Sequence, residues 1–184
     1  VVVSNTLSNQ FDGLVIIYTN GGIAVSNLKN RNLKLSGGAA DPNKFYDLLN
    51  SPTDRILFTE WAEDVGATVF QTHLLVYKDA LLVATNSSTK IATRRFLAVG
   101  KDVNGKIIHV IVNYPYDCTL YDGSYRVLEF LNKIIFMEVT FMINLDTGAQ
   151  DVFTLYNGDC TVNPKIVGKV PLSKAYNILA YYFE

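Results

Sequence analysis

The stretch INLDTGAQDVFTLYNGD, residues 143–159, carries an aspartate where an apolar run gives way to small residues. Asp146 ends that run, and the residues after it include Thr147 and Gly148, which are small enough for a ligand to approach the backbone. A carboxylate at the end of a strand can act as a general acid or base, or orient a substrate. The alternative is a hairpin in which the aspartate caps its own turn.

A second candidate for chemistry is YTNGGIAV, residues 18–25, directly after an apolar run. Gly21 and Gly22 leave peptide N–H groups uncovered, and the Asn20 amide beside them can both donate and accept hydrogen bonds. Such a turn suits an anionic oxygen. The alternative is a glycine turn between two strands.

Two adjacent arginines open a third stretch, TRRFLAVGKDVNGKIIHVIV, residues 93–112. A guanidinium can grip a phosphate or carboxylate through two parallel hydrogen bonds. Successive strand residues point to opposite faces, so at most one of Arg94 and Arg95 reaches any one pocket. The alternative is that both side chains lie in water at the end of a strand.

Composition indicates one domain spanning residues 1–184. Of the 184 residues 49% are hydrophobic and 18% are charged, and the formal net charge is -1. This near-neutral balance argues against nucleic acid or an acidic membrane surface as a partner. No apolar run is long enough to span a bilayer. The chain begins VVVSNTLSNQ, without Met, which indicates a processed chain or a fragment of a larger one.

The metal-ligating and redox residue types are few. His73 and His109 stand apart from any Cys/His cluster, so the sequence predicts neither a metal nor a cofactor. Whether Cys118 and Cys160 pair is left open by the sequence.

Short β-branched or aromatic runs between turn residues predict an α+β domain with a mixed, largely antiparallel sheet. The expected strands are residues 13–18, 55–59, 73–77, 80–84, 95–100, 106–112, 139–145, 151–156 and 176–183. Two-residue turns predict hairpins at Lys78-Asp79, Asn104-Gly105 and Asn157-Gly158, the last two suited to type I′ geometry.

Two segments predict helices that pack on the sheet. Residues 124–137 begin with Ser124 as N-cap, and residues 41–50 offer Asp41 as N-cap with Pro42 at the first helical position. The first helix has a predicted buried stripe of Val127, Phe130, Leu131, Ile134 and Ile135.

Five stretches, taken in their order along the chain, resemble the phosphodiester glycosidase family. The resemblance runs from about residue 11 to the end of the chain. The five stretches are IIYTNGGIAV, VFQTHLLVYKDALLV, TRRFLAVGKDVNGKIIHVIV, VLEFLNKIIF and INLDTGAQDVFTLYNG. The resemblance implies an α+β fold and hydrolysis of a sugar–phosphodiester linkage in a surface glycan or related glycoconjugate. It implies that Asp146 and Arg94 are catalytic and that the substrate is bound by Asn20, Gly21, Gly22, Arg95, Asn144, Thr147 and Gly148.

The chain departs from the family pattern at each motif. Ile23, Ala24, Thr147, Ala149 and Gln150 replace the family's residues, and its arginine falls at the position of Phe96. Two hypotheses therefore stay open: a phosphodiester hydrolase, or an inactive carbohydrate-binding or assembly module of a larger protein such as a phage tail or adsorption component. Both predict an extracellular, cell-surface or virion-associated protein whose partners are phosphorylated glycans or other chains of an assembly.

Overall fold

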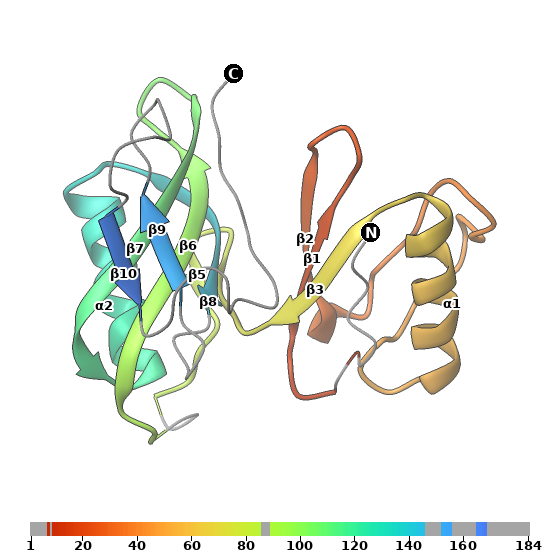
Figure 1. The fold of residues 1–184 in the computed structure, drawn as a ribbon, viewed down its shortest axis with the longest axis horizontal. Coiled ribbons are helices and arrows are strands. Elements are labelled where there is room, and N and C mark those ends of the chain that lie inside the picture. The colour runs from red at the N-terminus through yellow and green to blue at the C-terminus, as the bar shows by residue number, and fades with distance from the viewer. Residues whose placement is uncertain (1–6, 8, 86–88, 146–151, 156–164, 169–184) are drawn as a thin grey trace.

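The computed structural model describes residues 7, 9–85, 89–145, 152–155 and 165–168. Figure 1 shows one group of strands with α1 beside it and a second group with α2 against it. The elements, in chain order, are β1 (Gly13–Ile17), β2 (Ile23–Asn27), a 3-10 turn (Leu28–Asn30), α1 (Pro52–Asp64), β3 (Thr68–Thr72), β4 (Leu74–Tyr77), β5 (Ala80–Leu81), β6 (Ala92–Lys101), β7 (Ile107–Cys118), α2 (Leu120–Lys133), β8 (Glu138–Leu145), β9 (Val152–Leu155) and β10 (Lys165–Gly168).

The N-terminal sheet has three antiparallel strands in the order β2-β1-β3. Leu14 and Ile16 on β1 face a core that includes Phe58 and Trp61 of α1. The predicted strand at residues 55–59 is wrong, because these residues belong to α1. Ser51 caps the helix and Pro52 occupies its first turn, and a short apolar run alone does not distinguish strand from helix.

The helix predicted at residues 41–50 is also wrong, since the segment forms turns. The Asp41 carboxylate accepts the N–H of Asn43 instead of capping a helix, and Tyr46 pairs with Leu33 in an isolated bridge. Aspartate side chains compete with helix in this way by bonding to nearby backbone. The helix starts later, at Pro52.

The larger sheet has five antiparallel strands in the order β5-β4-β8-β6-β7. Alternation along β6 sends Phe96 and Ala98 into the core under α2, and Leu97 and Val99 into a second core facing β1. Together with the β9–β10 pair, the two sheets and two α-helices confirm the predicted α+β class with antiparallel pairing.

The N-cap of helix α2 lies five residues earlier than predicted. Thr119 is the N-cap, whereas Ser124 is buried inside the helix and its hydroxyl donates to the carbonyl of Leu120. Two of the five residues of the predicted buried stripe are buried. Val127 and Leu131 are buried, but the other three predicted members are exposed, namely Phe130, Ile134 and Ile135.

Two of the predicted hairpins lie within the described residues. Lys78 and Asp79, with φ of 52° and 59°, link β4 to β5 as predicted. The β6–β7 hairpin is also present, but its type I′ geometry is wrong. Only Gly105 of the Asn104-Gly105 pair has positive φ, because the Asp102 carboxylate accepts the N–H groups of Asn104 and Lys106 and shapes a wider turn. The Asn157-Gly158 turn and the strand predicted at residues 176–183 lie outside the described residues.

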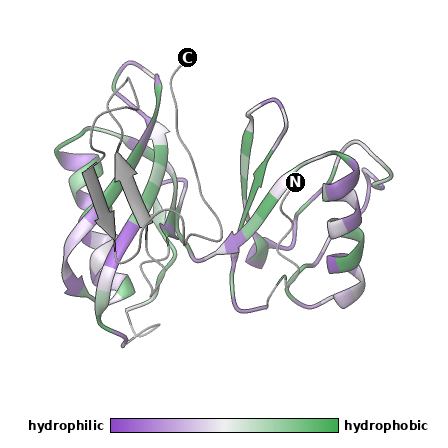
Figure 2. Ribbon diagram, in the orientation of Figure 1, coloured by the Kyte–Doolittle hydropathy of each residue, from purple (hydrophilic) through white to green (hydrophobic). Residues whose placement is uncertain are grey.

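A shared apolar core joins the two sheets. It contains Val15 of β1 together with Leu97, Phe141 and Ile143 of the larger sheet. Figure 2 shows hydrophobic residues along the strands of both sheets. At the crossover from β3 to β4, the Thr72 hydroxyl donates to the carbonyl of Asn144 at 2.6 Å.

Candidate functional site

The Asn-Gly-Gly turn closes the β1–β2 hairpin, and its polar groups are used within the turn. The Gly22 N–H donates to the Asn20 side-chain oxygen at 3.0 Å, and the Gly21 N–H donates to the Tyr18 carbonyl at 2.9 Å. Gly21 has φ of 81°, a value that favours glycine. The two glycine N–H groups therefore stabilise the hairpin and do not point at a common external acceptor.

The two arginines of β6 point to opposite faces of the sheet. Arg95 is buried on the face that carries Leu97, and its Nη2 donates to the Asn113 side-chain oxygen at 3.2 Å. Arg94 lies on the α2 face, where its Nη2 donates to the Lys90 carbonyl at 2.7 Å and its Nε to the Cys118 carbonyl at 3.4 Å. Arg94 is thus held near the start of α2 by two backbone acceptors.

Asn144 lies on the same face as Arg94. Asn144 of β8 is paired in register with Phe96 of β6. Arg94 lies two residues before Phe96 and is therefore the diagonal neighbour of Asn144 across the two strands. The Asn144 side-chain oxygen is buried, and no donor among the described residues reaches it. Asp146, Thr147 and Gly148 lie outside the described residues. Of the predicted site residues, the structure brings Arg94 and Asn144 together.

The Asn-Gly-Gly turn lies apart from Arg94 and Asn144. Thr72, which bonds to Asn144, is paired with Gly13 at the beginning of β1, whereas the turn follows the other end of that strand. The length of β1 separates these two points by roughly 13 Å. No single loop cluster in the described part of the chain unites the two groups.

Two tyrosines that were not predicted as site residues lie beside Arg94, and Tyr114 also packs against the core under α2. Tyr114 of β7 is paired in register with Arg94, and its ring lies edge-on to that of Tyr116 with centroids 6.1 Å apart. Tyr116 is 70% exposed. The signal was the sequence NYPYDC, residues 113–118, in which aromatic residues alternate at a strand end.

The thiol and metal chemistry of this region is limited. Burial raises the pKa of the Cys118 thiol, and the nearby Arg94 guanidinium offsets this only in part. A raised pKa keeps the thiol protonated and weakly nucleophilic at neutral pH. Within the described ranges, no three His, Cys, Asp or Glu side chains gather closely enough to hold a metal ion.

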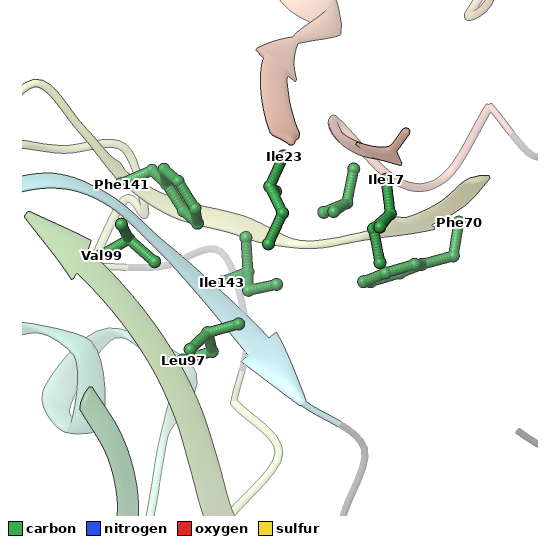
Figure 3. A pocket seen from close by; sticks show the side chains of 8 residues that line it. Ile17, Ile23, Phe70, Leu97, Val99, Phe141 and Ile143 are labelled. Carbon is green, nitrogen blue, oxygen red and sulfur yellow. The ribbon is translucent and has the colours of Figure 1, made fainter. Parts of the chain in front are cut away.

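A small cavity of about 10 Å³ lies between the two sheets (Figure 3). Only apolar side chains line it: Val15, Ile17, Ile23, Phe70, Leu97, Val99, Phe141 and Ile143. A cavity of this size and polarity has room for at most one water and offers it no hydrogen-bond partner. It therefore suits no sugar or phosphate.

Comparison with known proteins finds no matching family model, no matching curated protein and no matching solved structure. No helix in the described part of the chain has the length and apolar character needed to cross a membrane.

Proposed function

We propose that this chain is a non-catalytic carbohydrate-binding module of a larger extracellular or virion-associated protein, built on a scaffold that resembles the phosphodiester glycosidases. The observation that supports the proposal is that Tyr114 lies beside Arg94 and against Tyr116 at one end of the larger sheet, with Asn144 on the same face as a diagonal neighbour of Arg94. This proposed binding face combines an exposed aromatic ring with charged and amide side chains.

The chemistry of these groups suits a sugar. An exposed tyrosine ring offers a flat apolar surface for the C–H face of a pyranose, while its hydroxyl stays in water. Arg94 has a further nitrogen, Nη1, beyond the two that bond to backbone carbonyls, and it can donate to hydroxyls or a phosphate.

Within the described residues, the glycine turn and Arg94 do not share one phosphate cradle, which favours binding over hydrolysis. Stabilising a phosphodiester during cleavage needs several donors aimed at one group. In the described structure, the glycine N–H groups are used within their own turn, and that turn lies one strand length from Asn144. Binding to a glycan needs no such convergence.

The test is glycan binding by calorimetry, with teichoic-acid fragments and GlcNAc-1-phosphate diesters as ligands. Tyr116→Ala should weaken binding about tenfold, the effect of losing one well-placed aromatic contact. Tyr125→Ala, which removes another exposed tyrosine from α2, is the matched control and should bind like wild type. Equal affinities for wild type and Tyr116→Ala would contradict the proposed binding face.

Phosphodiester hydrolysis is the second candidate, favoured by the common face of Arg94 and Asn144. It is tested by incubating the same diesters with wild type and with Asp146→Asn. Product from wild type above that from the variant would establish catalysis and overturn the non-catalytic proposal. Product at the level of the variant would remove the hydrolase candidate.

A further inference from the structure

Two hairpin tips in the described part of the chain carry the same Asn-Gly pair, and only one of them holds its asparagine side chain in place. Asn20-Gly21 lies between β1 and β2, and Asn104-Gly105 lies between β6 and β7. Asparagine followed by glycine is a chemically labile pair, because the asparagine amide is thermolabile and glycine has no side chain to shield the next backbone nitrogen. The two tips therefore present the same reactive pair in two environments.

The backbones of the two tips are closely matched. Gly21 has φ of 81° and Gly105 has φ of 78°, and a Cβ added at either glycine would meet no atom within 4 Å. Each glycine N–H donates to the carbonyl three residues earlier, that of Tyr18 in one tip and that of Asp102 in the other, both at 2.9 Å. Both asparagines are exposed. Neither backbone conformation nor solvent access therefore distinguishes the two pairs.

The asparagine side chains of the two tips differ. The Asn20 side-chain oxygen accepts the Gly22 N–H at 3.0 Å, which fixes the orientation of the amide. Asn104 bonds through its backbone N–H, which donates to the Asp102 carboxylate at 2.9 Å, and its side chain forms no hydrogen bond with any residue that the structure describes. The Asn104 amide is therefore free to rotate toward the nitrogen of Gly105, whereas the Asn20 amide must first break a hydrogen bond.

We propose that Asn104 is a site of spontaneous deamidation and that the fold protects Asn20 from the same reaction. The nitrogen of Gly105 attacks Cγ of Asn104, a bond forms between these two atoms to close a succinimide ring, and the bond from Cγ to the amide nitrogen breaks. The proton of the Gly105 N–H leaves with that nitrogen as ammonia. Water then opens the ring at either carbonyl and leaves aspartate or isoaspartate. A side chain that is free to rotate reaches the attacking geometry more often, which favours Asn104.

The product changes both the charge and the covalent path of the β6–β7 tip. The new carboxylate follows Asp102 by two residues and makes the formal net charge of -1 one unit more negative. Isoaspartate also adds one carbon to the main chain next to the Lys101–Ile107 pair that closes the two strands. Both changes act on β7, whose neighbour in the described sheet is β6 alone.

The test is peptide mapping by mass spectrometry after the folded protein has been held in warm, mildly alkaline buffer. Trypsin releases residues 102–106, DVNGK, in which Asn104 is the only asparagine, and fragmentation of the peptide 1–29 locates Asn20. The converted fraction of each asparagine is followed with time, against a zero-time digest that measures conversion during handling. Asn104 should convert about five to ten times faster than Asn20, the effect of one hydrogen bond that must break before the ring closes.

The same measurement in concentrated urea is the matched control. Each asparagine follows a β-branched residue, Thr19 in one pair and Val103 in the other, so the unfolded pairs should convert at similar rates. Equal rates in the folded protein, or a difference that persists in urea, would overturn the proposal. Conversion of Asn104 in urea but not in the folded protein would also overturn it, because the fold would then protect both asparagines. The reaction is measured without a ligand, so its outcome is independent of glycan binding.

Discussion

Asn20 shows how the same residue can fit a ligand-binding motif and yet serve the backbone. Its side-chain oxygen accepts the N–H of Gly22 two residues later, which is the bond of an Asx turn. The motif Asn-Gly-Gly therefore has a complete explanation as the tip of a hairpin. Sequence alone leaves both interpretations open, because the residues that favour a tight turn are also those that leave N–H groups accessible.

Asn20→Ala should lower the free energy of unfolding by about 1 kcal/mol, the net value of one hydrogen bond in a turn. Glycan binding should not change, since Asn20 lies one strand length from the proposed binding face. Denaturant unfolding and calorimetry measure the two effects. Asn104→Ala, which removes an asparagine side chain from the tip of a different hairpin, β6–β7, is the control variant. If Asn20→Ala instead abolished binding at unchanged stability, the turn would be part of the ligand site.

Asp54 is the residue for which the structure predicts a pH dependence. The hydrogen bond from Lys44, at 2.7 Å, and the N–H of Asp47 hold the pKa of the Asp54 carboxyl below its ordinary value. A carboxyl with a lower pKa in the folded state stabilises the fold fully above its unfolded pKa. That contribution disappears as the pH falls through the folded value.

Wild type should therefore lose stability below about pH 4, and Asp54→Asn should lose less over the same range. At pH 7 the variant should be less stable by about 1 to 3 kcal/mol, because it removes a charged hydrogen-bond acceptor. Urea unfolding at several pH values measures both. The Asp47 and Glu129 carboxyls also have lowered pKa values, so the difference between the two proteins isolates Asp54. Parallel pH profiles would contradict the assignment.

At the scale of elements, the two serines near helix starts have different roles. Ser51 accepts the N–H of Asp54 as the N-cap of α1, whereas Ser124 is buried inside α2. Ser51→Ala should cost about 1 kcal/mol of stability, and Ser124→Ala less than about 0.5 kcal/mol, because the Leu120 carbonyl keeps its backbone role. Thermal unfolding of the pair is the measurement. A larger loss of stability for Ser124→Ala than for Ser51→Ala would contradict these roles and would favour the predicted N-cap role of Ser124.

Gly100 leaves no room for a side chain between β6 and the start of β8. A Cβ at this position would lie 2.1 Å from the Glu138 carbonyl oxygen and 2.8 Å from the Met137 side chain. Gly100→Ala should therefore destabilise the protein by about 1 to 3 kcal/mol, as overpacking does. Gly21→Ala is the comparison: it has open space around the new Cβ and only the cost of its positive φ. Equal unfolding midpoints for Gly100→Ala and wild type would show that the two strands can shift to accommodate the added methyl group without loss of stability.

The strands were more predictable from sequence than the helices. The centres of β6 and β8, residues 96–99 and 141–143, are continuous apolar runs that are buried on both faces, and this pattern is typical of a central strand. The run RILFT looks like a strand for the same reason, yet Ser51 and Pro52 start a helix there, and tertiary packing of Phe58 and Trp61 stabilises it. Asp41 failed as a cap because its carboxylate bonds to Asn43.

The candidate site was predictable only in part. Strand alternation alone places Arg94 and Arg95 on opposite faces. Which turns meet depends on how the two sheets pack, and that packing is carried by apolar residues such as Val15 and Phe141, which have no local signature. The tyrosines of β7 were missed because an aromatic residue in a strand is ordinary until its exposure is known.

For the whole molecule, the shared core between the sheets predicts one cooperative unit. Trp61, the single tryptophan, lies in the N-terminal core and reports on that sheet alone, while circular dichroism reports on both. The unfolding transition of wild type followed by Trp61 fluorescence should coincide with the transition followed by circular dichroism. Leu97→Ala should lower both midpoints together, at a cost of about 2 to 5 kcal/mol. Two separate transitions in wild type would indicate two independent domains.

The strand order of the larger sheet determines when it can form during synthesis. β8 lies between β4 and β6, yet about 60 residues separate the end of β4 from the beginning of β8 along the chain. At ribosomal speeds this interval lasts roughly 3 to 12 s. All residues of the N-terminal sheet and of α1 are synthesised before this interval begins. During the interval, the edge of β4 that pairs with β8 in the folded protein has no native partner. Until β8 is made, the edge of β4 that it pairs with in the folded sheet is therefore open to wrong strand pairing.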